Sequence, residues 1–185
     1  LLHGDQHVVH RVQRLHRAQA YWEMGDKKPM AALAIYNKGV EALAAGDYGE
    51  AMHLFGQAAT LDCGFPWPAT HLAWTLSTCP DERLRDGRLA IVYAIMALDV
   101  FKTDIPDFIG TLAAAYAASG EFEKALWLCD KAASIWPSEE TDRMRQAFRQ
   151  GSAYVEPSGP PPDQEGISRE GIGRVGGRFL AGDFQ

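Results

Sequence analysis

Four histidines near the start of the chain have the type and spacing that could hold a metal ion. His3, His7 and His10 stand at i, i+4 and i+7, which places three rings on one face of a helix, and His16 follows. Neutral imidazoles at this spacing can bind transition metals. No cysteine or second helix supplies a further ligand, so a solvated or partner-facing surface competes with a metal site. A metal- or cofactor-associated accessory module of an enzyme is therefore one alternative for this chain.

Catalytic and nucleotide-binding motifs are absent from the sequence. It contains no HExxH, no GxSxG and no GxxxxGK followed by Ser or Thr. Residues 171–176 form a GxGxxG string, but a dinucleotide loop needs a strand before it and a helix after it, and the sequence predicts neither. We therefore predict a chain that is not an enzyme and that uses no cofactor.

The elements that would position binding residues repeat along the chain. The stretch Gly46–Ala51 recurs 74 residues later as Gly120–Ala125, a Gly-acid-aromatic turn that runs into a helix. A third copy lies between them and is stretched at 78–87, because Ala51 and Ala90 are 39 residues apart whereas Ala90 and Ala125 are 35 apart. A helix, a turn and a second helix form one unit that cannot bury its apolar face alone. The repeats predict an all-α solenoid of three helical hairpins.

Composition and periodicity divide the chain into three segments. The predicted repeat domain, 32–155, starts with helices over 30–45 and 48–62 and ends with a third unit over 106–139. A capping helix over 139–150 closes it, with Ser138 as N-cap. An N-terminal amphipathic helix over 5–25 dominates the segment 1–31, and an extended Gly/Pro-rich tail occupies 156–185. Some packing residues of the repeats are predicted to be small, among them Gly39, Ala90, Ala94 and Ala97.

The N-terminal helix offers a second kind of contact. Val8, Val12, Leu15 and Trp22 form an apolar seam, so a homo-oligomer joined through this helix is possible. The segment 1–31 carries five Lys/Arg against three Asp/Glu, whereas 32–155 carries ten against sixteen. An acidic body argues against binding along a nucleic-acid backbone. No run of 18 apolar residues exists, so we expect no membrane span within this chain.

Three cysteines, an odd number without CxxC spacing, bear on the compartment. Cys63, Cys79 and Cys129 lie among apolar residues, and we expect all three to be small buried side chains kept reduced. Unpaired cysteines favour a cytoplasmic location. The chain starts at Leu1 rather than Met, so removal of an upstream signal or anchor stays open, and the compartment is undetermined.

The hairpin sequences resemble the tetratricopeptide repeat (TPR), a 34-residue pattern of two helices. Residues 106–139 match it through Leu112, Ala113, Tyr116, Gly120, Phe122, Ala125, Ala132 and Pro137. Residues 32–65 match it through Gly39, Gly46, Tyr48, Ala51, Phe55 and Ala58. The middle unit resembles a variant repeat common in bacterial members. The resemblance implies a binding scaffold, and the family has many unrelated partners.

Some family members grip chaperone C-termini with Lys/Arg and Asn side chains on their first helices. The matching positions here are Tyr36, Val40, His71, Asp107 and Thr111, none of which is a cation. The resemblance therefore implies a ligand other than such an acidic terminus.

The inner face of the predicted stack is a candidate groove for partner proteins. We expect it to comprise Tyr36, Asn37, Val40, Trp67, His71 and Trp74. Such an aromatic surface suits an apolar helix or an extended peptide. Alternatively, Trp67 and Trp74 fill space between repeats, or the chain's own N-terminal helix occupies part of the groove.

The tail supplies the second set of candidate contacts. Its apolar residues, which we expect to anchor it on a partner, are Ile167, Ile172, Val175, Phe179, Leu180 and Phe184. We predict a protein–protein interaction scaffold, an accessory or structural subunit of a larger assembly, whose tail and N-terminal helix lie on neighbouring subunits.

Overall fold

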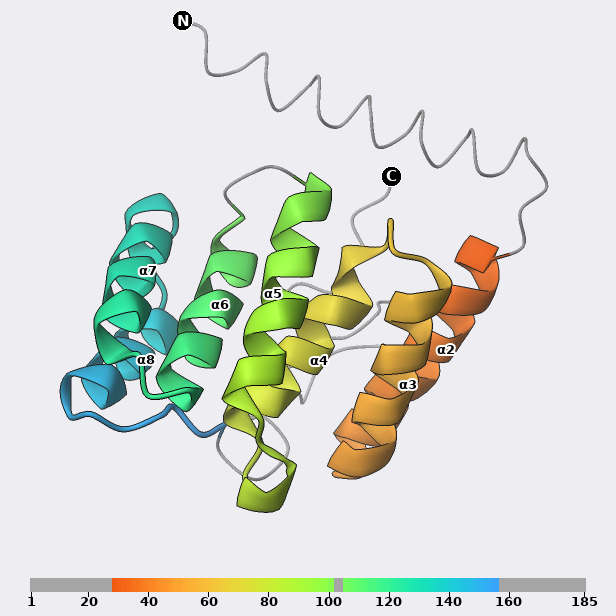
Figure 1. Ribbon diagram of the computed structural model, residues 1–185, viewed down its shortest axis with the longest axis horizontal. Helices are drawn as coiled ribbons and strands as arrows, with labels where there is room; N and C mark the ends of the chain where they lie inside the picture. The colour runs from red at the N-terminus through yellow and green to blue at the C-terminus, as the bar shows by residue number, and fades with distance from the viewer. Residues whose placement is uncertain (1–27, 102–104, 157–185) are drawn as a thin grey trace, which may run out of the picture.

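The computed structural model describes residues 28–101 and 105–156, and within these ranges all regular structure is helical (Figure 1). The α-helices are α2 (Lys28–Ala44), α3 (Tyr48–Leu61), α4 (Pro66–Thr78), α5 (Gly87–Phe101), α6 (Pro106–Ala118), α7 (Phe122–Ile135) and α8 (Glu139–Arg149), with a 3-10 helix at Glu82–Leu84. None of these helices is long and apolar enough to cross a membrane. The predicted helix over 5–25, the histidines within 3–16 and the anchors of the tail lie outside the described residues.

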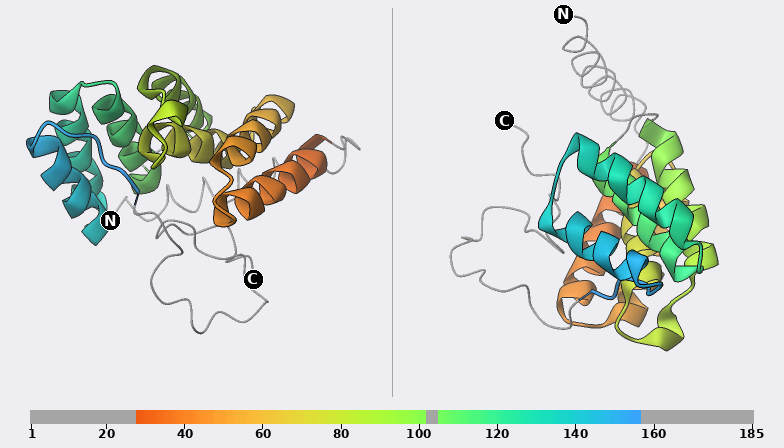
Figure 2. Two further views of the ribbon diagram at one scale, coloured as in Figure 1. Left: turned by 90° about the horizontal axis from the view of Figure 1, so that it is seen from below. Right: turned by 90° about the vertical axis from the view of Figure 1, so that its left-hand side faces the viewer.

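The helices form three consecutive hairpins, α2 with α3, α4 with α5 and α6 with α7, and α8 packs against α7. Each hairpin also contacts the next one, through α3 with α4 and α5 with α6. Seen from below, the stack is an arch with α2 at one end and α8 at the other (Figure 2, left). The predicted all-α solenoid is confirmed.

The repeated Gly-acid-aromatic stretch forms the same turn in the first and third hairpins. Gly46 and Gly120 have φ of 81° and 86°, a left-handed conformation that glycine adopts without strain. Each closes its helix with the same backbone hydrogen bond: the amide of Gly46 donates to the Leu43 carbonyl, 3.0 Å away, and that of Gly120 to the Ala117 carbonyl, also 3.0 Å away. The 74-residue repeat in the sequence is therefore a repeat in local geometry.

Small residues let the helices of a hairpin approach closely. A Cβ atom built on Gly39 of α2 would lie 2.7 Å from the ring of Phe55 on α3, so the ring packs directly on the α2 backbone. On α5, the predicted packing residues Ala90, Ala94 and Ala97 are all buried. Small side chains on one helix thus make room for large ones on its neighbour.

The longer connection in the middle hairpin is an ordered link between α4 and α5. Arg83 pairs with Asp81 at 2.7 Å, and its hydrogen bonds lower the pKa of that carboxyl to about 2. The amide of Asp86 then donates to the Leu76 carbonyl at 2.9 Å. At Gly87, a Cβ would lie 2.5 Å from backbone atoms of Ala118 and Ser119. The stretched turn therefore lets the start of α5 touch the end of α6.

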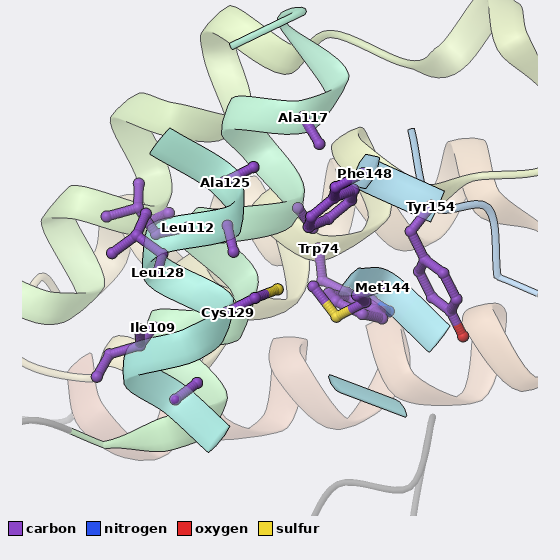
Figure 3. Close-up of a cluster of buried hydrophobic side chains, with 14 of the residues drawn as sticks. Trp74, Ile109, Leu112, Ala117, Ala125, Leu128, Cys129, Met144, Phe148 and Tyr154 are labelled. Atoms are coloured by element: carbon purple, nitrogen blue, oxygen red, sulfur yellow. The ribbon is translucent and has the colours of Figure 1, made fainter. Parts of the chain in front are cut away.

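The last helix closes the stack as predicted. The Ser138 side chain accepts a hydrogen bond from the Thr141 amide at 3.1 Å, which makes it the N-cap of α8. Met144 and Phe148 of α8 are buried in one cluster with Leu128 of α7 and Trp74 of α4 (Figure 3). The apolar side of α8 thus covers the open end of the third hairpin.

The prediction for the cysteines is wrong at one position. Cys79 and Cys129 are buried, but Cys63 is exposed. Cys63 lies two residues after the end of α3, Leu61, in the connection to α4. Its apolar sequence neighbours therefore say little about its burial.

Candidate partner-binding surface

The inner side of α2 presents four residues in a row, which we call the α2 stripe: Leu33, Asn37, Val40 and Ala44. Their spacing of four, three and four residues keeps them on one helical face. Val40 is half-buried and the other three are exposed, Leu33 to 38%. Two predicted groove residues, Asn37 and Val40, therefore lie on an accessible surface.

Tyr36, predicted to line the groove, lies beneath this surface. Its ring is only 5% exposed. Its ring centroid is 5.8 Å from that of Phe55, 5.3 Å from that of Phe65 and 5.4 Å from that of His71. Burial raises the pKa of the Tyr36 phenol well above its ordinary value. Tyr36 thus joins α2 to α4 and supports the groove from below.

The predicted groove residues of α4 are more buried than those of α2. Trp67 is half-buried and meets Phe108 of α6 edge-on, with ring centroids 5.2 Å apart. His71 is buried, and its Nδ1 atom donates to the Trp67 carbonyl at 3.1 Å. Trp74 is 4% exposed. Of the three, only Trp67 is partly exposed.

Hydroxyl groups on α4 explain how a helix with several polar residues can be buried. Thr70 donates to the Pro66 carbonyl at 3.0 Å and Thr78 to the Trp74 carbonyl at 2.8 Å. Thr75 and Ser77 bond one turn back in the same way, at 2.8 and 2.7 Å. Because each hydroxyl is satisfied within its own helix, burying it leaves no donor unpaired. Polarity alone therefore misplaces these residues on a solvent-facing surface.

An extended segment after α8, residues 152–156, runs along the lower edge of the stack (Figure 1) to the end of α4 and is called the strap. Gly151, with φ of 68°, turns the chain out of α8. Tyr154 is buried with its ring centroid 6.0 Å from that of Trp74. The Trp74 indole donates to Oε2 of Glu156 at 3.1 Å, and the Glu156 amide donates to the Thr78 carbonyl at 2.9 Å. The strap thus binds α4 as an extended peptide would.

Sequence reasoning missed the strap, because its contacts join residues about eighty positions apart. Trp74 and Glu156 are separated by 82 residues. The available signal was local: Tyr154 and Val155, two apolar residues, follow directly after the glycine that ends the capping helix. An aromatic residue there favours a return to the core over departure into solvent.

The outer side of the stack carries an apolar surface that the sequence analysis also passed over. On α5, Leu89, Val92, Ile95 and Met96 are all at least 40% exposed, and we call them the α5 patch. The buried face of the same helix consists of alanines, so α5 presents its larger side chains outward. A helix with small residues on its predicted packing side and large ones opposite was the signal for this surface.

The five clamp positions are buried or half-buried in the structure. Tyr36, His71 and Thr111 are buried, and Val40 and Asp107 are half-buried, so these five positions offer no cation to a ligand. Within 28–101 and 105–156, no group of three or more His, Cys, Asp or Glu side chains could hold a metal ion. The histidine cluster stands outside these ranges and stays a prediction.

No protein-family model matches the sequence, and no curated protein matches it significantly. The structure, however, resembles solved helical-repeat domains. The first TPR of Spaghetti (RPAP3), bound to the HSP90 peptide SRMEEVD, aligns at a TM-score of 0.55 and 20% identity, over 64% of this chain and 90% of that one. The first TPR domain of the human RPAP3 protein, solved by NMR, aligns at 0.58 and 20% identity, over 66% and 93%. The chain has the fold of a tetratricopeptide-repeat domain.

Proposed function

We propose that this chain is a non-catalytic protein-interaction scaffold whose inner face takes an extended segment of a partner protein. The observation that carries the proposal is the strap. Its contacts with α4 combine a backbone hydrogen bond at Thr78, a side-chain hydrogen bond at Trp74 and the packing of Tyr154. Recognition of an extended peptide uses this same combination of main-chain bonds and side-chain pockets.

The accessible part of the inner face sets the chemistry of the partner. Leu33, Val40 and Trp67 provide apolar surface, and the Asn37 amide can both donate and accept hydrogen bonds. Tyr36 packs in one cluster with Val40 and Trp67, and its ring meets that of His71. The TPR domain of RPAP3 was solved with the acidic peptide SRMEEVD, but the five clamp positions here hold no Lys or Arg. The partner segment is therefore apolar or neutral rather than acidic.

Both ends of the chain extend this role to a larger assembly. The tail carries apolar residues at intervals, from Ile167 to Phe184, in a Gly/Pro-rich stretch that has too few of them for a core of its own. The N-terminal segment contains the apolar seam that begins with Val8 and Val12. In the proposed arrangement the stack supplies a rigid surface, and the two ends lie on neighbouring subunits of one complex.

The experiment compares matched variants in quantitative affinity purification from the source cells. Val40→Asp places a charge on the α2 stripe, and Val92→Asp places the same charge on the α5 patch. We expect Val40→Asp to lose the specific partners, while Val92→Asp retains them and both variants keep wild-type helicity by circular dichroism. Equal retention of partners by both variants would contradict the proposal.

A direct binding measurement tests the chemistry of the ligand. A fluorescent SRMEEVD peptide titrated with the full chain should give no saturable rise in anisotropy. The five clamp positions hold no Lys or Arg side chain that could pair with its carboxylates. Tight binding of this peptide would show that the inner face recognises acidic termini after all.

A further inference from the structure

The outer face of α5 begins and ends with a charged residue. Arg88 stands in the first turn of the helix and Asp99 in the last one, and both side chains are exposed. Between them lies the α5 patch, in which Val92 is 52% and Ile95 48% exposed. Figure 1 shows α5 in front of α4, against which it packs, so this face points away from the stack. The exposed face of α5 is therefore apolar in its middle and oppositely charged at its two ends.

The spacing of these residues is that of a helix-packing surface. Four exposed residues stand at i, i+4, i+7 and i+11, and we call them the α5 seam: Arg88, Val92, Ile95 and Asp99. With 3.6 residues per turn, this spacing keeps them in one narrow row along the helix. Paired helices of coiled coils meet along rows with the same spacing. Because the alanines of α5 already pack in the stack, the seam is a second face patterned for helix packing.

The outer helices on either side of α5 have no such seam. The alanines Ala51, Ala90 and Ala125 hold the same place in their hairpins, and positions counted from them are polar or small on α3 and α7, apart from one tryptophan. They are Gly49, His53, Gly56 and Thr60 on α3, and Glu123, Trp127, Asp130 and Ser134 on α7. Since α3 and α7 pack in the same stack with these residues, the fold does not require the α5 seam. A clustered exposed apolar surface of this kind indicates an interaction site.

The order of residues in the seam makes it complementary to itself. Arg88 and Asp99 have the same midpoint along the helix as Val92 and Ile95. A second copy of α5, turned end over end about this midpoint, therefore places its Asp99 opposite Arg88 and its Ile95 opposite Val92, and the same contacts recur at the other end. Such a surface forms an isologous interface with a twofold axis. In a parallel pair, each charge would instead face a like charge.

The two charges of the seam do not stabilise the helix that carries them. The N-terminal end of a helix favours anions and its C-terminal end favours cations, whereas Arg88 and Asp99 stand the other way round. Neither residue forms an ion pair with another described residue. In an antiparallel pair, Arg88 lies beside the C-terminal end of the other helix and Asp99 beside its N-terminal end. Both charges then have an oppositely charged residue and a favourable helix end as neighbours.

We infer that two copies of this chain associate through their α5 helices, packed antiparallel about a twofold axis, so that Arg88 of each copy pairs with Asp99 of the other. Leu89 of one copy then lies beside Met96 of the other, which covers the rest of the α5 patch. The inference does not rest on the proposed function. The α5 patch is on the outer side of the stack and the α2 stripe on the inner side, so the dimer leaves both inner faces open to partners.

The size of the contact sets the strength to expect. Helix α5 has 15 residues and is therefore about 22 Å long. One helix face from each copy belongs to the small interfaces, below about 1,200 Å², that form transient complexes. We expect half of the chains to be dimeric at roughly 10–100 μM.

Sedimentation equilibrium of the full chain tests this association. Measured from about 1 to 300 μM, the average mass should rise from that of one chain toward that of two. A reducing agent is present throughout, because Cys63 is exposed and a disulfide between two chains would imitate the dimer. A mass of one chain over the whole range would overturn the inference.

Charge reversal tests which residues meet. Arg88→Asp or Asp99→Arg places two pairs of like charges in the symmetric dimer, so each should weaken association at least about tenfold. The reversed charges agree with the helix dipole, so we expect both variants to stay folded. Combining the two changes in one chain restores opposite charges at both ends, and should return the Kd to within about threefold of the wild type. If the double variant associates no better than the single ones, the antiparallel pairing is wrong.

A matched pair of variants tests the apolar part of the seam. Val92→Asp places two carboxylates near the twofold axis and should leave the chain monomeric at every concentration. His53→Asp makes the same change in charge at the equivalent position of α3, and should leave the Kd unchanged. Circular dichroism checks that both variants keep their helicity. A dimer that survives Val92→Asp would assign the association to another surface and overturn the inference.

Discussion

The helices α2 and α4 hold the same place in successive hairpins, yet only one of them is open to solvent. Every residue of α4 from Pro66 to Thr78 is buried except Trp67, which is half-buried, although five of them are Thr, Ser or His. On α2, Leu33 and Met30 are exposed although both are apolar. Exposure along this chain therefore follows the number of neighbours a helix has more closely than the polarity of its residues.

The neighbours account for this difference. Helix α4 packs against α3, α5 and α6, and the strap contacts its second half at Trp74 and Thr78. Helix α2 packs mainly against α3 and meets α4 through Tyr36. In a linear stack an interior repeat contacts two others and the first described repeat contacts one. The α2 stripe is consequently accessible where the equivalent side of α4 is buried.

The largest expected effect on stability comes from truncating Trp74 of α4, and the comparison is with Val40, which stands one repeat earlier on α2. Trp74→Ala removes a buried ring from the cluster with Met144 and Phe148, and should lower the free energy of unfolding by about 3–5 kcal/mol. Val40→Ala removes two methyl groups from a half-buried site on α2, and should cost about 1 kcal/mol or less. Urea unfolding followed by circular dichroism measures both. Similar costs at the two positions would mean that α2 and α4 are equally packed.

A smaller effect is expected where the two helices differ in a single methyl group. One repeat after Gly39 of α2 stands Ala73 of α4, which is buried. Because a Cβ at Gly39 would meet the Phe55 ring, Gly39→Ala should destabilise the protein by about 1–3 kcal/mol despite its better helix propensity.

The matched control for this change is another glycine. A Cβ at Gly49 of α3 would meet nothing closer than the Asp47 carboxylate at 3.8 Å, so Gly49→Ala should be neutral or slightly stabilising. In the double variant Gly39→Ala with Phe55→Leu, the added cost of the alanine should shrink, since the ring that opposes it is gone. If Gly39→Ala costs the same stability in the Phe55→Leu background, contact with the Phe55 ring is not the cause of that cost.

The smallest effect is a loss of stability at alkaline pH, which probes the buried sides of the arch. Burial raises the pKa of the Cys129 thiol from 9.0 to about 12, so this group stays protonated in the folded chain after it ionises in the unfolded one. Its contribution is fully present below pH 9 and is lost as the pH rises toward 12. Burial also raises the pKa of the Tyr36 phenol, so its contribution to the free energy of unfolding is likewise lost as the pH rises above 10.

Unfolding free energies between pH 8 and 11 measure this loss in variants. Cys129→Ala should flatten the slope that begins near pH 9 in the wild type, and Tyr36→Phe should flatten the part above pH 10. Slopes that match the wild type in both variants would assign the alkaline loss to other groups. Cys63→Ser, at an exposed position, should leave the profile unchanged.

The sequence by itself determined the local geometry of this protein. The glycines at 46 and 120, the Ser138 cap and the alanines of α5 are each read from residues within one or two turns, because turns, caps and helix periodicity depend on neighbours along the chain. Repetition of such a unit then implies a stack, since one hairpin cannot bury its own apolar face.

Only the tertiary structure decided which surfaces remain open. Tyr36 and His71 share the helical phase of Asn37 and Val40, but contacts between hairpins bury them. Cys63 is exposed in the connection between α3 and α4, and Trp74 is covered by a strap that ends 82 residues later. Burial of this kind depends on which distant segments come to lie side by side, and periodicity within a single helix contains no information about that.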